Sequence, residues 1–310
     1  MTYSYLKSGV DIKAAGALVE IIKNATNSKQ IGGFAGLFEH SAFDDYYLAA
    51  CVDGVGTKII PLIERKDTKT IANDLFAMNI NDLICCGAQP LFFLDYIALN
   101  RLDTEFTARL ICDLDNILKK YNCVLLGGET SELGDLILKD NFDVSGFLTG
   151  IVKKDRLLSK DNVRRGDYIV ALKSGGPHSN GFTLIRKLHN DGLLSDELFE
   201  QSLAPVSIYF DIISKLNKMS LINACANITG GGILSNVARS IPEGLRADID
   251  LSTVKLSPLF KKIADITGLD EAFNVFNMGV GFCVICSEEN LKQVISLAGM
   301  YSPFILGRVV

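Results

Sequence analysis

Short apolar segments and longer segments with helical spacing alternate along this chain, and this alternation constrains its fold more than any other feature. Residues 46–52 form a strand-like apolar run, and residues 71–86 carry apolar side chains at helical spacing that stops before Gly87. Residues 90–99 and 104–121 repeat this strand-then-helix pair. Further strands are predicted at residues 123–126, 143–152 and 168–172, and a further helix at residues 182–190. The alternation predicts an α/β or mixed α+β fold.

A polar stretch near the middle of the chain predicts a division into two domains. The chain has 310 residues, which exceeds the usual size of a single hydrophobic core. Residues 153–167 carry charges of both signs and end in a Gly-Asp turn, as domain linkers often do. We therefore expect an N-terminal domain at residues 1–155 and a C-terminal domain at residues 156–310.

The charge of the chain argues against a polyanionic partner. The formal net charge is -5, the sequence pI is about 5.3, and the basic residues form no long run. A nucleic acid or an anionic membrane surface would require a basic patch. The apolar stretches are also interrupted well short of the roughly twenty residues that a membrane helix needs. We expect neither a nucleic acid nor a membrane as partner.

The cysteines indicate a reducing compartment. The chain has eight of them, and its first residues lack the apolar core of a secretory leader, so we expect a cytoplasmic protein without a disulfide framework. Cys283 and Cys286 form a CxxC, but no second pair exists, and both lie in the apolar run GFCVICS. This pair is interpreted as part of a buried strand rather than as a metal or redox site.

The sequence CVDGVGTK at residues 51–58 places an acid, two glycines and a lysine directly after a predicted strand. Gly54 and Gly56 can serve a tight turn alone, because glycine adopts backbone angles that other residues avoid. Alternatively, Asp53 can carry Mg²⁺ and Lys58 can lie near a phosphate bound by the free amides of the loop. Both interpretations remain open from these residues alone.

Two carboxylates lie on the first long predicted helix. Asp74 and Asp82 are separated by eight residues, which places them roughly 80° apart around the helix, with Asn81 almost above Asp74. A solvated helix face would explain such charges. The residues between them are mainly apolar, however, which indicates a buried helix whose carboxylates need partners, and a divalent ion is one such partner.

Glycines and an acid also follow the strand predicted at residues 123–126. Gly127 and Gly128 would let the backbone approach a ligand, and Glu129 could accept a hydrogen bond from it or hold a metal, although a plain turn explains the same residues. Asp95 is a weaker candidate of the same kind, because it can lie within its strand. Ligands of α/β sheets gather at the carboxyl ends of strands, which favours a shared site.

Two polar, glycine-rich segments of the C-terminal half precede predicted helices. One is SGGPHSNG, in which a single loop histidine is more often structural than catalytic. The other is ITGGG, whose glycines could present backbone amides to an anion. The candidate residues of the two segments are Ser174, His178, Ser179, Asn180, Thr229, Gly230, Gly231 and Gly232. The sequence contains no Walker motif, GxSxG elbow, HExxH or dinucleotide GxGxxG.

Taken together and in order, these segments resemble the family of aminoimidazole ribonucleotide synthetase, also called phosphoribosylformylglycinamidine cyclo-ligase. The resemblance spans nearly the whole chain. Each glycine motif is weak alone, but nine motifs in the expected order make accidental similarity very improbable. The matching segments are YLKSGVDIKAAGALVEIIK, GGFAGLFE, DGVGTK, NDLFAMNINDLICCGAQPLFFLDYIA, LLGGET, FDVSGF, SGGPHSNGFTLIRK, ITGGG and FNMGVG.

The resemblance implies an ATP-dependent ring closure in de novo purine synthesis. Formylglycinamidine ribonucleotide and ATP would give aminoimidazole ribonucleotide, ADP and phosphate, with ATP and Mg²⁺ as cofactors. The formyl oxygen would be activated as a phosphoryl species, and the amidine nitrogen of the substrate would then attack that carbon. The family fold implies an N-terminal ATP-binding domain whose sheet pairs with that of a second copy in a homodimer, and a C-terminal domain that binds substrate and phosphate.

The resemblance also implies roles for single residues. Asp53 and Asp82 would hold the metal, and Lys58 would face phosphate. The nucleotide would contact Asp74, Gly127, Gly128 and Glu129, while the segments at Ser174–Asn180 and Thr229–Gly232 would face the substrate and phosphate. The implied catalytic set is His178, Asn227 and Lys58.

One residue departs from the family pattern. Asn227 stands where the family usually has histidine before ITGGG, and the chain is also slightly short at its C-terminus. An amide cannot titrate near neutral pH, so we expect Asn227 to position phosphate rather than to act as a base. The alternatives are a thiamine phosphate kinase, a selenophosphate synthetase or a hydrogenase-maturation protein of the same superfamily, and a nucleotide-binding scaffold protein without turnover.

Overall fold

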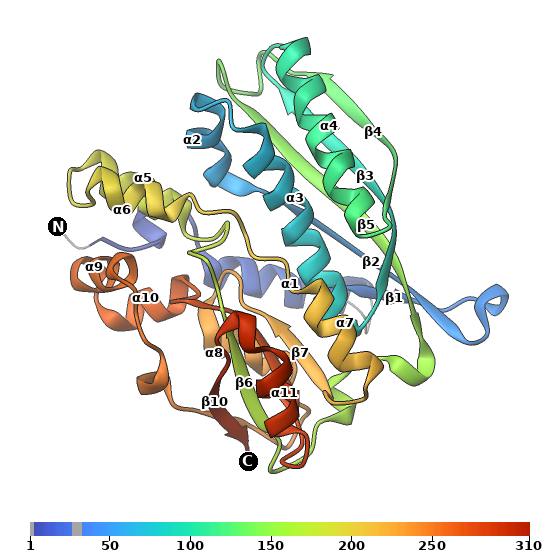
Figure 1. The fold of residues 1–310 in the computed structure, drawn as a ribbon. Coiled ribbons are helices and arrows are strands. Elements are labelled where there is room, and N and C mark those ends of the chain that lie inside the picture. Colours follow the sequence, from blue (N-terminus) through green and yellow to red (C-terminus); the bar gives the residue numbers. More distant parts are fainter. Residues whose placement is uncertain (1–2, 27–32) are drawn as a thin grey trace.

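The computed structural model describes residues 3–26 and 33–310, and Figure 1 shows two sheets with helices packed against them. The GGFAGLFE segment begins at Gly32, which lies outside the described residues. Helix α1 (Ile12–Thr26) precedes the first sheet. Within the described residues, no helix is both long enough and apolar enough to cross a membrane.

The N-terminal sheet has five strands in the order β1-β2-β5-β3-β4. The strands pair antiparallel except for β3 and β4, which run parallel. The sheet is therefore mixed. The expectation that ligands gather at the carboxyl ends of strands applies to parallel sheets, so it does not apply directly to this one. The strands are β1 (Gly36–Phe38), β2 (Tyr46–Gly54), β3 (Gln89–Leu99), β4 (Val124–Glu132) and β5 (Phe142–Lys153).

Helices cover one face of this sheet. They are α2 (Ile59–Glu64), α3 (Thr68–Leu83) and α4 (Thr104–Lys120), and Figure 1 shows α3 and α4 side by side on the sheet. The Asp67 side chain accepts a hydrogen bond from the Thr70 amide and begins α3. One 3-10 turn extends α3 to Cys86, and Gly87 ends it with a φ of 81°, which favours glycine. These observations confirm the helices predicted at residues 71–86 and 104–121.

The opposite face of the N-terminal sheet exposes large apolar side chains. Val52 is 68% exposed, Leu126 is 62% exposed and Val124 is 59% exposed. Tyr96 and Phe147 add aromatic rings to the same exposed set. Contiguous exposed apolar surface of this kind usually marks an interaction site.

The second sheet lies in the C-terminal half and has the order β7-β9-β6-β10-β8, with antiparallel pairs throughout. Its strands are β6 (Tyr168–Lys173), β7 (Ala224–Asn227), β8 (Ala247–Ile249), β9 (Val280–Cys286) and β10 (Phe304–Val309). Its helices are α5 (Phe182–Asn190), α6 (Asp196–Ser202), α7 (Phe210–Lys218), α8 (Gly232–Ala238), α9 (Pro258–Thr267), α10 (Leu269–Val275) and α11 (Leu291–Leu297).

Strand β9 is buried along its whole length, so Cys283 and Cys286 belong to the core, as the sequence predicts. One hydrophobic core cluster contains side chains from both halves of the chain, including Phe76 of α3 and Leu216 of α7. The two sheets are connected by residues 154–167, and the cores of the two halves are continuous.

One predicted turn is absent. Gly127, Gly128 and Glu129 do not turn after a strand, because β4 continues through them to Glu132 in parallel register with β3. Gly128 is required for a different reason. A Cβ atom there would lie 2.4 Å from Oδ1 of Asp95 on the neighbouring strand, so only glycine fits without a shift of that carboxylate.

Candidate active site

A cavity of about 610 Å³ lies between the two halves of the molecule. From the N-terminal half it is lined by residues 53–57, which close β2 and lead into α2. From the C-terminal half it is lined by Ser179 and Asn180 before α5 and by Thr229 and Gly230 before α8. The tertiary structure thus brings together three sequence segments that were candidates separately.

The backbone of Asp53 is held by one side chain of α3. Asn79 Oδ1 accepts a hydrogen bond from the Asp53 amide at 3.0 Å, and Asn79 Nδ2 donates to the Asp53 carbonyl at 3.1 Å. The Asp53 carboxylate accepts from the Gly54 amide at 2.8 Å. Desolvation nevertheless raises the pKa of Asp53 to about 6. The carboxylate is fixed in place, and none of the described lysines or arginines forms an ion pair with it.

Asp82 lies one turn beyond Asn79 on α3. Burial and the negative charge of Asp53 raise the pKa of Asp82 to about 7, although a hydrogen bond from Asn227 and the positive charge of Arg239 both act to lower it. Asn227 Nδ2 donates that bond to Asp82 Oδ1 at 2.8 Å. Among the described residues, no lysine or arginine forms an ion pair with either acid.

The donor set of this acid pair fits a magnesium ion. Two carboxylates that repel one another, and that form no ion pair within the described residues, leave a position that a divalent ion would stabilise. Within the described residues, no group of three or more histidine, cysteine or carboxylate side chains could hold a metal by itself. Mg²⁺ usually binds through one or two carboxylates and completes its shell with water and substrate phosphates, so two acids suffice.

Several buried polar atoms next to the cavity have no hydrogen-bond partner in the protein. They are Ser179 Oγ, Asn180 Nδ2 and Asn227 Oδ1. Buried polar groups are rarely left unpaired, and each such group is a candidate contact for a ligand or water. Ser179 and Asn180 line the cavity together with Asp53, and Asn227 is hydrogen-bonded to Asp82. Unpaired polar atoms next to both acids suit a polar or phosphorylated ligand.

Lys58 and Asp74 form an ion pair inside the molecule. Their side chains are 0% exposed, and Lys58 Nζ lies 2.7 Å from Asp74 Oδ2. The same ammonium donates to the Ala204 carbonyl at 2.7 Å. Burial raises the pKa of Asp74, and the charge of Lys58 opposes this shift. Neither residue is among those that line the cavity, and a phosphate could reach Lys58 only if this pair opened.

His178 is also enclosed. It is 2% exposed, its φ is 58°, and its Nε2 has no hydrogen-bond partner among the described residues. Burial, together with the nearby charge of Lys58, lowers the pKa of His178 to about 3. The imidazole is therefore neutral at pH 7, and an imidazolium acid is not available from it at that pH.

The remaining predicted residues lie apart from the cavity lining. Glu129 is exposed on β4, which is separated from β2 by two strands, a distance of about 14 Å at the usual strand spacing. Ser174 donates its hydroxyl to the Gly176 carbonyl at 2.7 Å. The sequence predicts that the Gly232 amide is free to bind an anion, but this amide donates to the Thr229 carbonyl. Gly231 has a φ of 91°, which requires glycine.

Sequence reasoning missed Asn79 and the two threonines of the cleft. Thr57 and Thr183 line the cavity from opposite sides, and their hydroxyls are 3.0 Å apart. A signal for Asn79 existed, because it is the single polar residue in the otherwise apolar run LFAMNI at residues 75–80. Thr57 lies in the DGVGTK motif itself, but the motif does not show that it meets a residue 126 positions away.

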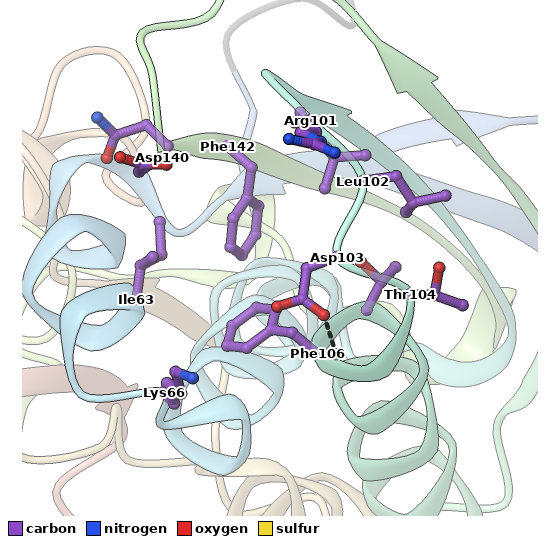
Figure 2. Close-up of a pocket in the computed structure, with 12 residues that line it drawn as sticks. Ile63, Lys66, Arg101, Leu102, Asp103, Thr104, Phe106, Asp140 and Phe142 are labelled. Atoms are coloured by element: carbon purple, nitrogen blue, oxygen red, sulfur yellow. Dashed lines mark hydrogen bonds between the residues drawn. The ribbon is translucent and has the colours of Figure 1, made fainter.

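A second cavity of about 610 Å³ lies between α2 and the start of α4, and Figure 2 shows its lining. The rings of Phe106 and Phe142 form an edge-to-face pair in it, with centroids 5.7 Å apart. Lys66 and Arg101 contribute positive charges, and Asp103 and Asp140 contribute negative ones. This cavity has the same volume as the first, but none of the predicted site residues lines it. Chemistry rather than size therefore identifies the cleft at Asp53 as the candidate active site.

Comparisons with known proteins identify the family of this chain. The chain matches the model for "AIR synthase related protein, N-terminal domain" over residues 35–152 and that for the C-terminal domain over residues 164–310. A curated phosphoribosylformylglycinamidine cyclo-ligase of Bacillus cereus is 36% identical over 318 residues, which cover 96% of this chain and 92% of the relative.

Solved structures share the fold at lower identity. Thiamine monophosphate kinase from Aquifex aeolicus superposes with a TM-score of 0.67 at 18% identity, covering 97% of this chain and 95% of that one. PurL of Thermotoga maritima, complexed with ADP, gives a TM-score of 0.61 at 17% identity over 91% of this chain and 43% of that one. These likenesses show the fold alone. The two domain matches and the full-length curated relative show more, namely that this chain belongs to the AIR synthase related family.

Proposed function

We propose that this protein is a phosphoribosylformylglycinamidine cyclo-ligase, which converts formylglycinamidine ribonucleotide and ATP into aminoimidazole ribonucleotide, ADP and phosphate. The observation that carries the proposal is the cleft in which Asp53 meets the polar segments at Ser179–Asn180 and Thr229–Gly230. Asp82 does not line this cleft, but it is hydrogen-bonded to Asn227, just before the second of these segments. The name and near-complete coverage of the curated Bacillus cereus relative support the same activity.

The proposed chemistry requires alignment more than a nucleophilic side chain. The formyl oxygen of the substrate attacks the γ-phosphorus of ATP, and ADP leaves. The amidine nitrogen then attacks the formyl carbon and loses a proton, and the oxygen departs with the phosphate. Two ligands must be held close together while negative charge accumulates, so positioning and electrostatic stabilisation dominate.

The residues of the cleft fit these tasks. Asp53 and Asp82 would hold Mg²⁺, which when bound offsets the charge of the phosphates. Ser179 and Asn180 offer an unpaired hydroxyl and an unpaired amide donor to phosphate oxygens. Thr229 lines the cleft beside them, although its hydroxyl donates to Asn236. Asn227 orients the Asp82 carboxylate through its hydrogen bond and has no proton to transfer near neutral pH. Gly127, Gly128 and Glu129 remain proposed nucleotide contacts, since they lie on β4, the exposed edge strand of the same sheet.

The exposed apolar face of the N-terminal sheet supports a homodimer. This face leaves apolar side chains exposed to water, namely Val52, Val124 and Leu126. A second copy of the same sheet would cover them. In such a dimer the nucleotide contacts on β4 would lie next to the partner subunit. This arrangement would bring Glu129 to a site that it cannot reach within one chain.

A product assay tests the proposed function. The protein, formylglycinamidine ribonucleotide, ATP and Mg²⁺ are expected to yield aminoimidazole ribonucleotide and one ADP per product. Thiamine monophosphate serves as the competing substrate, because a kinase of that specificity shares the fold. ADP release with thiamine monophosphate but not with formylglycinamidine ribonucleotide would replace the cyclo-ligase by the kinase. ATP binding without turnover of either would favour a scaffold protein.

A further inference from the structure

Residues 203–209, here called the connector, join α6 to α7 and lie along α3 of the other half of the molecule. The connector belongs to no strand, so its backbone groups need partners from elsewhere. Side chains of α3 and of the segment before it supply them. The bonds run from Lys58 to the Ala204 carbonyl (2.7 Å), from the Val206 amide to Asp74 (2.8 Å), from Asn73 to the Val206 carbonyl (3.0 Å), from Asn81 to the Ser207 carbonyl (2.8 Å) and from the Tyr209 amide to Asn81 (3.1 Å).

Asn81 makes two of these five bonds with one side chain. It is 1% exposed, its Nδ2 donates to Ser207, and its Oδ1 accepts from Tyr209. A carboxamide can donate and accept at the same time, which neither a carboxylate nor an apolar side chain can do. Asn81 precedes Asp82 directly on α3, so the position of the connector is tied to the position of that acid.

The other side of the connector holds the polar loop of the cleft. Ser207 Oγ accepts a hydrogen bond from the Gly175 amide at 3.2 Å, and the Tyr209 hydroxyl donates to the Lys173 carbonyl at 2.8 Å. Gly176 packs close to the connector as well, because a Cβ atom on it would lie 3.6 Å from the Ala204 Cβ. The connector is therefore hydrogen-bonded to α3 on one side and to the loop at residues 174–181 on the other.

We propose that the connector is a positioning element, in which Asn81 and Ser207 fix the loop at residues 174–181 relative to Asp53 and Asp82. The two residues act through others and touch no reacting atom. The inference rests on the proposed function only for what is being aligned, namely the two ligands of the ring closure. A displacement of about 1 Å in such an alignment can lower a rate by roughly 100-fold, so the connector is expected to govern kcat.

Kinetic measurements on four variants test the proposal. Asn81→Ala removes both bonds to the connector, and Ser207→Ala removes the acceptor of the Gly175 amide, whereas Ser207→Thr keeps a hydroxyl. Asn217→Ala is the matched control, because Asn217 is 8% exposed and donates from α7 to the Arg156 carbonyl, away from the loop. We expect kcat to fall about tenfold or more in Asn81→Ala and about fivefold in Ser207→Ala, with KM for ATP within about threefold of wild type. Ser207→Thr and Asn217→Ala are expected to keep kcat within about twofold.

Hydrogen exchange gives a second measurement that requires no turnover. Without ligands, the amides of residues 174–181 are expected to lose about tenfold of their protection in Asn81→Ala and Ser207→Ala, but not in Ser207→Thr or Asn217→Ala. A wild-type protein without cyclo-ligase turnover would refute the proposed function, and the exchange result would still decide the role of the connector.

Two outcomes would overturn the role of the connector. One is unchanged exchange at residues 174–181 in both alanine variants of the connector contacts. The other is a loss of kcat in Asn217→Ala as large as that in Asn81→Ala, which would mean that any lost buried hydrogen bond has this effect. If Asn81→Ala fails to fold, the comparison of Ser207→Ala with Ser207→Thr decides alone, since Ser207 is only half-buried.

Discussion

Asn227 donates a hydrogen bond of 2.8 Å to Asp82, and this bond joins the end of β7 in one half of the molecule to the end of α3 in the other. The resemblance implies a histidine at this position, and the bond shows which part of a histidine's capacity an asparagine retains. The asparagine keeps a hydrogen-bond donor for the carboxylate but lacks a proton that titrates near neutral pH.

The first prediction concerns this residue. Asn227→His is expected to turn over at a rate similar to that of the natural protein, with at most a new titration near neutral pH, because the amide already orients Asp82. Asn227→Ala is expected to be slower, because the Asp82 carboxylate is no longer oriented. It is also expected to lower the free energy of unfolding by about 1–3 kcal/mol, because a buried carboxylate loses its hydrogen-bond donor. Steady-state rates from pH 6 to pH 9 measure both. A gain of about a hundredfold or more in the histidine variant would show that the chain lacks a catalytic base.

The second prediction concerns the metal. Asp53→Asn and Asp82→Asn are each expected to raise the Mg²⁺ concentration needed for half-maximal turnover, because each removes a charged oxygen ligand. Asp115→Asn, on the exposed side of α4, is the control and should leave the Mg²⁺ dependence unchanged. Titration of Mg²⁺ at fixed ATP measures the effect. Wild-type turnover of both variants at limiting Mg²⁺ would remove these acids from the metal site.

The third prediction separates a structural from a catalytic role for Lys58. Lys58→Met leaves the buried Asp74 carboxylate unpaired, so we expect a loss of about 3–5 kcal/mol in the free energy of unfolding. Adding Asp74→Asn should restore part of it, because the amide oxygen can still accept from Val206. Lys119→Met, which breaks an exposed pair, should cost less than about 1 kcal/mol. Urea unfolding measures all four proteins. Equal losses in Lys58→Met and Lys119→Met would contradict a structural role.

The fourth prediction follows from the lowered pKa of His178. Between the ordinary value near 6.5 and the folded value of about 3, the unfolded chain binds a proton that the folded protein does not. Stability from this group is therefore complete above pH 6.5 and is lost as the pH falls, at about 1.4 kcal/mol per pH unit.

Comparison of variants isolates this contribution. His178→Asn keeps a residue that tolerates positive φ, and His40→Asn replaces an exposed histidine as the control. From pH 7 to pH 5, wild type is expected to lose about 2 kcal/mol more than His178→Asn, and the same amount as His40→Asn. Parallel stability curves for wild type and His178→Asn would show that His178 protonates in the folded protein.

The fifth prediction concerns the exposed face of the N-terminal sheet. The wild-type protein is expected to be a dimer at micromolar concentration, because its N-terminal sheet exposes an apolar face. Obligate interfaces are large and apolar, so such a dimer should not dissociate easily on dilution. Val52→Glu and Leu126→Glu should produce monomers by placing a charge in the interface. Leu234→Glu, on an exposed apolar residue of the C-terminal half, should stay dimeric. Light scattering measures the mass, and a monomeric wild type would refute the dimer.

The local sequence was sufficient for the order and type of the main elements. The apolar spacing of α3 and its stop at Gly87 follow from helix geometry and from the left-handed angle that glycine tolerates. The apolar run of β2 and its end at Gly54 follow from strand chemistry in the same way. These features depend on neighbours a few residues away, so they can be read without a fold. The ordered motifs likewise sufficed to indicate the family.

Tertiary packing decided which candidate residues meet. Asn227 and Asp82 are 145 positions apart, and nothing local predicts that one orients the other. Lys58 is a residue type that often binds phosphate, yet its charge is neutralised by Asp74. The two side chains are buried together, because a buried charge requires an opposite charge beside it. Gly128 looks like a turn residue, but its need for glycine comes from Asp95 on the adjacent strand. A side chain's partner is chosen by the long-range packing that removes both from water, and the sequence does not contain that choice locally.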